Sequence, residues 1–114
     1  MTGNSPTLEV RFYRSETGNQ PVRDWLLDLS PEDRKLIGED IKTAQFGWPL
    51  GMPLIEKIEP GIWEVRSHIR HGIARTLFTV EDDLMVLLHG FIKKSNKIPV
   101  EDLRVARQRL AKLR

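Results

Sequence analysis

Hydrophobic and polar residues alternate near the start of the chain and then recur with a helical period. Leu8, Val10 and Phe12 alternate with polar or charged neighbours, which predicts a half-buried strand over residues 8–13. Farther along, the apolar positions fit one face of a short helix, with Pro21 suited to its first turn. These positions, spaced i, i+3, i+4 and i+7, are Val22, Trp25, Leu26 and Leu29.

A second helix is predicted to begin directly after Ser30. Its hydroxyl can cap the helix, Pro31 fits the first turn, and the carboxylates of Glu32 and Asp33 face the positive end of the helix. The helix should end near Gly47, before the next proline. The two helices are therefore expected to form a hairpin.

The pattern changes after a loop rich in proline and glycine at residues 48–53. Four short segments with strand-like composition follow, separated by hairpin turn signals such as Pro60-Gly61 and Arg70-His71-Gly72. These segments span residues 54–59, 62–69, 72–80 and 84–92. Because no helix separates them, they predict an antiparallel meander.

A last helix is predicted to begin after Pro99, with an apolar seam formed by Leu103, Ala106, Leu110 and Leu113. The order β-α-α-β-β-β-β-α indicates an α+β fold and a single domain over residues 1–114, whose small, polar residues 1–7 should fray. We expect the helical hairpin to cover one face of the sheet and to leave the other face at least partly open.

Charge is distributed unevenly along the chain. Residues 1–60 carry seven Lys/Arg and ten Asp/Glu, whereas residues 61–114 carry eleven Lys/Arg and six Asp/Glu. A basic C-terminal half is typical of a polyanion-binding face, although a solvated basic helix would look the same. The chain has no cysteine, which excludes disulfides and thiolate catalysis and suits a reducing cytoplasm. We expect no secretory leader and no membrane span.

Two arginines of the predicted meander are candidates for binding a phosphate. A turn at Arg70-His71 would place Arg66 directly opposite Arg75 on the open sheet face. Like charges in that position need a reason, and a shared anion is one. The alternatives are that a turn at His71-Gly72 shifts the register, or that each arginine pairs with Glu64 or another carboxylate.

Lysines and histidines supply further candidates. Lys93, Lys94 and Lys97 lie between the last strand and the last helix, where they could hold phosphates or simply form a soluble connector. The spacing of His68, His71 and His89 does not fit zinc, and we expect no metal or other cofactor. His89 is either a proton carrier or a hydrogen-bonded strand residue. The sequence contains no Walker, Rossmann or serine-hydrolase motif.

Several segments together resemble one family. The segment LLHGFIKKSNKIP, residues 87–99, resembles the pattern LLHGFxKKxxKxP of phage-derived HigB-like toxins in the RelE/ParE superfamily. The preceding segments PLIEKI and GIWEVR, the strand at 73–78 and the E-x-x-x-A-x-x-R pattern within 101–109 also resemble this family. The resemblance extends over residues 8–112, and the combination in order is more specific than any one segment.

This resemblance implies a RelE-like fold and a toxin that cleaves messenger RNA, commonly on the ribosome, under the control of a helix-turn-helix, HigA-like antitoxin. Such chemistry uses the RNA 2′-hydroxyl as nucleophile and needs a base, an acid and cations. Two other possibilities stay open: a ParE-like inhibitor of DNA gyrase and a non-catalytic, phage-derived binding module.

The resemblance also suggests roles for individual residues. Arg66 matches a strand arginine that stabilises transition-state charge, Arg75 is a second candidate, and Lys93 could stabilise the phosphorane or the leaving oxygen. Candidates for RNA binding are Lys57, Lys94, Lys97, Arg104 and Arg107. His89 could be the acid or the base. The sequence departs from several RelE-type nucleases because no tyrosine or histidine follows His89, and this leaves the acid and base unassigned.

Overall fold

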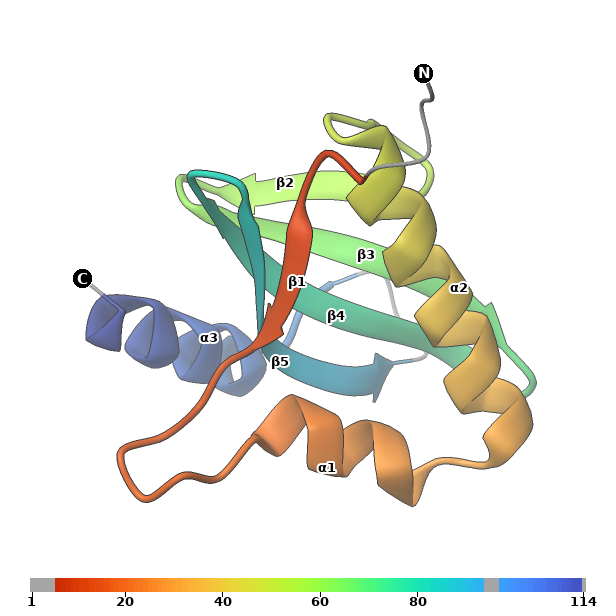
Figure 1. Cartoon of the computed structure of the whole chain (residues 1–114). Helices are drawn as coiled ribbons and strands as arrows, with labels where there is room; N and C mark the ends of the chain where they lie inside the picture. Colours follow the sequence, from red (N-terminus) through yellow and green to blue (C-terminus); the bar gives the residue numbers. More distant parts are fainter. Residues whose placement is uncertain (1–5, 94–96, 114) are drawn as a thin grey trace.

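The computed structural model describes residues 6–93 and 97–113, which form an α+β fold with helices on both faces of one sheet (Figure 1). The elements are β1 (Glu9–Phe12), α1 (Pro21–Asp28), α2 (Pro31–Gly47), β2 (Ile55–Glu59), β3 (Ile62–Ile69), β4 (Gly72–Glu81), β5 (Leu84–Lys93) and α3 (Val100–Lys112). The order and type of the elements are as the sequence predicts.

The five strands lie in the order β1-β5-β4-β3-β2. Strands β2 to β5 form the predicted antiparallel meander, whereas β1 pairs with β5 in the parallel direction, so the sheet is mixed. A parallel neighbour needs a long crossover connection, and the helical hairpin provides one between β1 and the meander. Short-range patterning identified β1 as a strand but carried no information about its direction.

The helical hairpin covers one face of the sheet. The amide of Asp33 donates to the Ser30 hydroxyl at 3.2 Å, so the predicted cap of α2 is confirmed, as is the end of the helix at Gly47. The buried stripe of α2 consists of Ile37, Ile41 and Ala44, which are 0–6% exposed. It packs with Val65, Ala74 and Phe78 of the sheet, forming the larger of the two core clusters.

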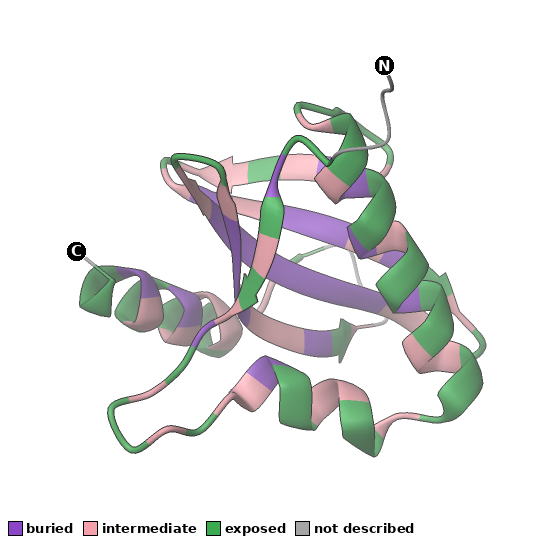
Figure 2. Ribbon diagram, viewed as in Figure 1, coloured by how far each residue is buried: buried purple, intermediate pink, exposed green. Residues whose placement is uncertain are grey.

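Helix α3 packs against the opposite face, which we expected to be at least partly open. Its residues Ala106 and Leu110 join Leu77 and Leu88 in a second buried cluster, and the helix turns its buried side towards the sheet in Figure 2. Beyond α3, at the outer end of β3, described residues of this face are partly or fully exposed. None of the helices in the described residues is long and apolar enough to cross a membrane.

Candidate functional site

The two candidate arginines lie directly opposite each other. The register of β3 and β4 pairs Arg66 with Arg75 and His68 with Ile73, so the turn falls at Arg70-His71, the first of the two alternatives that the sequence left open. Along the same face, β4 pairs Ile73 with Lys93 of β5. Cross-strand pairing therefore brings four of the residues singled out from the sequence to one region of the sheet.

A buried carboxylate lies between the two arginines. Nη1 of Arg75 donates to Oε2 of Glu64 at 2.9 Å, and Nε of Arg66 lies 3.7 Å from Oε1 of the same group. Glu64 and Arg75 are 0% and 2% exposed. Pairing with Glu64, the alternative considered above, thus accounts for the opposed like charges. The open-face position expected for Arg75 is wrong, because the second sheet face is covered there.

Arg66 differs from Arg75 in being accessible. Its side chain is 21% exposed, and together with His68 it borders a small pocket of about 150 Å³ at the edge of the sheet. His68 is itself exposed. Residues two apart on a strand point to the same face, so this histidine stands beside the accessible arginine. The sequence drew attention to His68 only as a possible metal ligand, and its alternation with Arg66 was the signal for a shared site.

His89 is held by helix α3. Its Nε2 lies 2.7 Å from Oδ1 of Asp102, and its Nδ1 lies 3.5 Å from Nη1 of Arg109. Both ring nitrogens therefore face protein groups, an arrangement that favours the hydrogen-bonded strand residue over the proton carrier. The imidazole also stacks on Phe91, with 5.7 Å between ring centroids. Strand β4 separates His89 from Glu64, since both residues pair with Leu77.

Arg109 reaches from α3 to the bulged part of β5. Its Nη1 donates to the carbonyl of Leu88 at 2.7 Å, and its guanidinium lies 5.6 Å from the ring centroid of Tyr13. Burial lowers the pKa of the guanidinium below its ordinary value, and the charge interaction with the Tyr13 phenol partly offsets that shift. Sequence analysis missed Asp102, Arg109 and Tyr13, although the spacing i, i+4, i+7 of Asp102, Ala106 and Arg109 places them on one helix face.

The remaining basic candidates belong to different elements of the chain. Lys57 lies over the ring of Trp63, with Nζ 5.6 Å from the centroid. Lys57, Arg75 and Lys97 all border a pocket of about 330 Å³, whereas Lys94 lies outside the described residues. Lys97 is exposed, and Lys93, at the end of β5, is partly exposed.

Two arginines of α3 expected to bind RNA are paired with carboxylates. Arg104 forms an ion pair with Glu101 within the helix. Arg107 binds Glu59 of β2, with its Nη2 at 2.6 Å and its Nε at 2.9 Å from the carboxylate, and these hydrogen bonds hold the pKa of Glu59 below its usual value. Both pairs are at the surface, where water and salt weaken them, so a phosphate could compete for either arginine.

The accessible part of the site is thus an arginine, a histidine and a lysine at the outer end of the meander. In residues 6–93 and 97–113, no three histidine, aspartate or glutamate side chains come together as a metal site. The chemistry that Arg66, His68 and Lys93 can supply is binding of an anion and transfer of a proton.

Comparison with known proteins agrees with this fold. The family model described as "Phage derived protein Gp49-like (DUF891)" matches residues 24–111, from α1 almost to the end of α3. None of the curated proteins compared with the chain matches its sequence. The matched segment contains the whole meander, the two opposed arginines and the Asp102–His89 pair. The chain therefore belongs to the Gp49-like family of phage-derived proteins, which is part of the RelE/HigB-like toxin superfamily.

Proposed function

We propose that this protein is the toxin of a type II toxin–antitoxin system and that it cleaves messenger RNA on the ribosome, with the RNA 2′-hydroxyl as nucleophile. The observation that carries the proposal is the accessible group of Arg66, His68 and Lys93 in a chain of this family. These side chains supply what cleavage by an internal hydroxyl requires: positive charge and an imidazole that can accept or donate a proton.

We assign to Arg66 the stabilisation of negative charge in the transition state. Negative charge builds on the phosphate oxygens as the 2′-hydroxyl attacks, and a cation already in place stabilises that charge without reorganisation. Glu64 restrains the Arg66 guanidinium from one side at 3.7 Å, and Arg75 in turn fixes Glu64. In this proposal Arg75 is a positioning residue, which suits its burial better than a direct contact with RNA.

Proton transfer is assigned to His68, and Lys93 serves as a second cation. His68 and Lys93 both pair with Ile73, one on each side of β4, so their Cα atoms are about 10 Å apart. Side chains of this length can meet a phosphate between them. His89 then has a structural role, joining β5 to α3 through Asp102. The partner of the toxin would be a helix-turn-helix, HigA-like antitoxin, whose acidic residues suit the same cationic surface.

The test is conditional expression followed by mapping of message ends. The proposal expects growth arrest with cuts inside translated messages, and loss of both with Arg66→Ala, since removing such a cation costs about a hundredfold or more in rate. Lys35→Ala, on the exposed side of α2, is the control with the same charge change. DNA damage with intact messages would instead identify a gyrase inhibitor, and normal growth would identify a non-catalytic module.

A second comparison separates the two histidines. His68→Gln should abolish cleavage and leave the free energy of unfolding unchanged, because the side chain is exposed. His89→Gln should lower the free energy of unfolding, because it removes the ring that stacks on Phe91 and the contact of Nδ1 with Arg109. If His89→Gln stopped cleavage in a fully folded protein and His68→Gln did not, the assignment of proton transfer to His68 would be wrong.

A further inference from the structure

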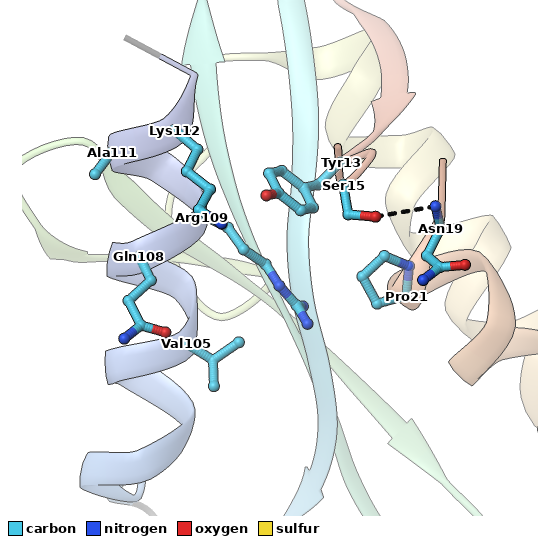
Figure 3. A pocket seen from close by; sticks show the side chains of 9 residues that line it. All are labelled: Tyr13, Ser15, Asn19, Pro21, Val105, Gln108, Arg109, Ala111 and Lys112. Atoms are coloured by element: carbon cyan, nitrogen blue, oxygen red, sulfur yellow. Dashed lines mark hydrogen bonds between the residues drawn. The ribbon is translucent and has the colours of Figure 1, made fainter. Parts of the chain in front are cut away.

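A pocket lies away from the accessible arginine, between α3 and the loop that follows β1 (Figure 3). Its volume is about 700 Å³, within the range of small-ligand sites. Its lining comprises Tyr13, Ser15, Asn19, Pro21, Val105, Gln108, Arg109, Ala111 and Lys112. Two of these side chains are cationic, four can donate a hydrogen bond as neutral groups, and none is acidic.

One wall of this pocket is a closed turn. The amide of Ser15 donates to the carbonyl of Asn19 at 2.8 Å, and the amide of Asn19 donates to the Ser15 hydroxyl at 3.0 Å. Gly18 adopts a φ of +91° at the tip, a conformation that L side chains rarely adopt. The turn therefore holds Ser15 and Asn19 in place opposite the last two turns of α3.

Arg109 is the charge at the centre of the pocket. Figure 3 shows its side chain extending from α3 across the space towards Pro21 and Asn19. Within the described residues, Nη1 of Arg109 makes both of its hydrogen bonds, one to the Leu88 carbonyl and one towards Nδ1 of His89. No carboxylate oxygen of these residues lies within 4.0 Å of its guanidinium nitrogens. The donors on Nε and Nη2 are left for a ligand.

A partly buried cation without a counter-charge is costly. The lowered pKa of Arg109 reflects this, because its cause is loss of water around the guanidinium. Lys112 adds a second positive charge at the rim, where its nearest acidic group, Glu16, is 3.9 Å away and 89% exposed. An anion that bound between Arg109 and Lys112 would supply a counter-charge to Arg109 and would add to the exposed contact of Lys112 with Glu16.

We propose that this pocket is a binding site for a phosphate group of an RNA strand, held by Arg109 and Lys112 and by the neutral donors of Asn19 and Gln108. The choice of RNA as the source of the phosphate rests on the proposed function. Phosphate offers several acceptor oxygens at once, which matches a pocket lined by donors from two elements and by no acceptor carboxylate. The site shares no lining residue with the pocket beside Arg66 and serves to bind RNA, not to cleave it.

The test is a titration of the full chain followed by heteronuclear NMR, with inorganic phosphate, 5′-AMP, adenosine and acetate as separate probes. The proposal expects phosphate and AMP to shift the amide signals of residues 13–20 and 105–112 in a saturable way, and adenosine to have no effect there. Saturable shifts from acetate at the same concentration would contradict the proposal, because the pocket would then be a general carboxylate site, suited to an acidic peptide.

Substitutions inside and outside the pocket show whether the phosphate binds there. Gln108→Glu places a negative charge in the pocket from an exposed position and should weaken phosphate binding at least tenfold. Thr43→Glu on α2 makes the same change in net charge elsewhere and should have little effect. Arg109→Lys should also weaken binding, since lysine lacks the forked donors. Equal binding by Gln108→Glu and Thr43→Glu would overturn the proposal.

The experiments distinguish a wrong assignment of this binding site from a wrong assignment of nuclease activity. Neither the NMR titration nor its variants depend on cleavage. If phosphate bound as expected while messages stayed intact, the pocket would stand and the nuclease would not. If messages were cut but phosphate produced no saturable shifts in the pocket, the nuclease would stand and this binding site would not.

Discussion

The buried carboxylate between the two arginines should be among the most sensitive positions of the fold. Glu64→Gln removes the negative charge that faces Arg75 at 2.9 Å and Arg66 at 3.7 Å, and leaves two arginines opposed on neighbouring strands. Removing one partner of a buried ion pair costs about 3–5 kcal/mol, because the other charge stays buried without compensation. That is a large fraction of the roughly 5–15 kcal/mol by which domains are stable.

The assay is urea unfolding followed by tryptophan fluorescence, with thermal unfolding as a second measurement. With an unfolding entropy of about 2.1 cal/mol/K per residue, the expected loss in this 114-residue chain lowers the Tm by about 12–20 °C. Glu101→Gln removes an exposed ion pair with Arg104 and should leave the midpoint unchanged. A double variant with Met at positions 64 and 75 should recover at least half of the loss.

A small loss of stability in Glu64→Gln would contradict the buried ion pair. If Glu64→Gln lowered the free energy of unfolding by less than about 1 kcal/mol, the pair would behave as a solvated one, and Arg75 would regain its place as a candidate for direct contact with RNA. If the Met double variant were less stable than Glu64→Gln, packing around the pair and not its charge would be the dominant contribution.

Two further predictions concern packing and pH. In Gly90→Ala the new Cβ would lie 2.3 Å from Cε3 of Trp25, so unfolding experiments should show a loss of about 1–3 kcal/mol, whereas Gly38→Ala, with nothing within 4 Å, should not destabilise the protein. Because Arg107 lowers the pKa of Glu59 from 4.5, their pair stabilises the fold above about pH 4.5 and loses this contribution as the pH falls through the lowered value. The difference in stability between wild type and Arg107→Gln should therefore close between pH 6 and pH 3, and a constant difference would contradict the assignment.

The sequence predicted local features well because they depend on neighbours in the chain. The hairpin between β3 and β4 follows from a turn signal between two alternating segments, which left two registers open, and the structure has the one that pairs Arg66 with Arg75. The start of α2 follows from Ser30 and the proline after it. Such features need no knowledge of what packs on top.

Features that depend on which helix covers the sheet could not be predicted from neighbouring residues in the chain. Alternation places Arg75 on a face but does not say that this face is covered and that the side chain is buried on Glu64. The contact between His89 and Asp102 depends on how α3 docks on β5. Arg109 is not one of the apolar residues of the seam predicted for α3, but it lies where the helix meets the sheet, because the packed face of α3 is wider than its apolar residues indicate.

The proposed cleavage of RNA through the RNA's own 2′-hydroxyl can be tested directly on ribosomes programmed with a defined message. The purified protein should cut the message and leave a 2′,3′-cyclic phosphate and a 5′-hydroxyl. A single 2′-deoxy nucleotide on the 5′ side of the cut should abolish cleavage at that position only, because the nucleophile is missing. Cleavage that persists at the deoxy position, or an uncut message with wild-type protein, would contradict the account.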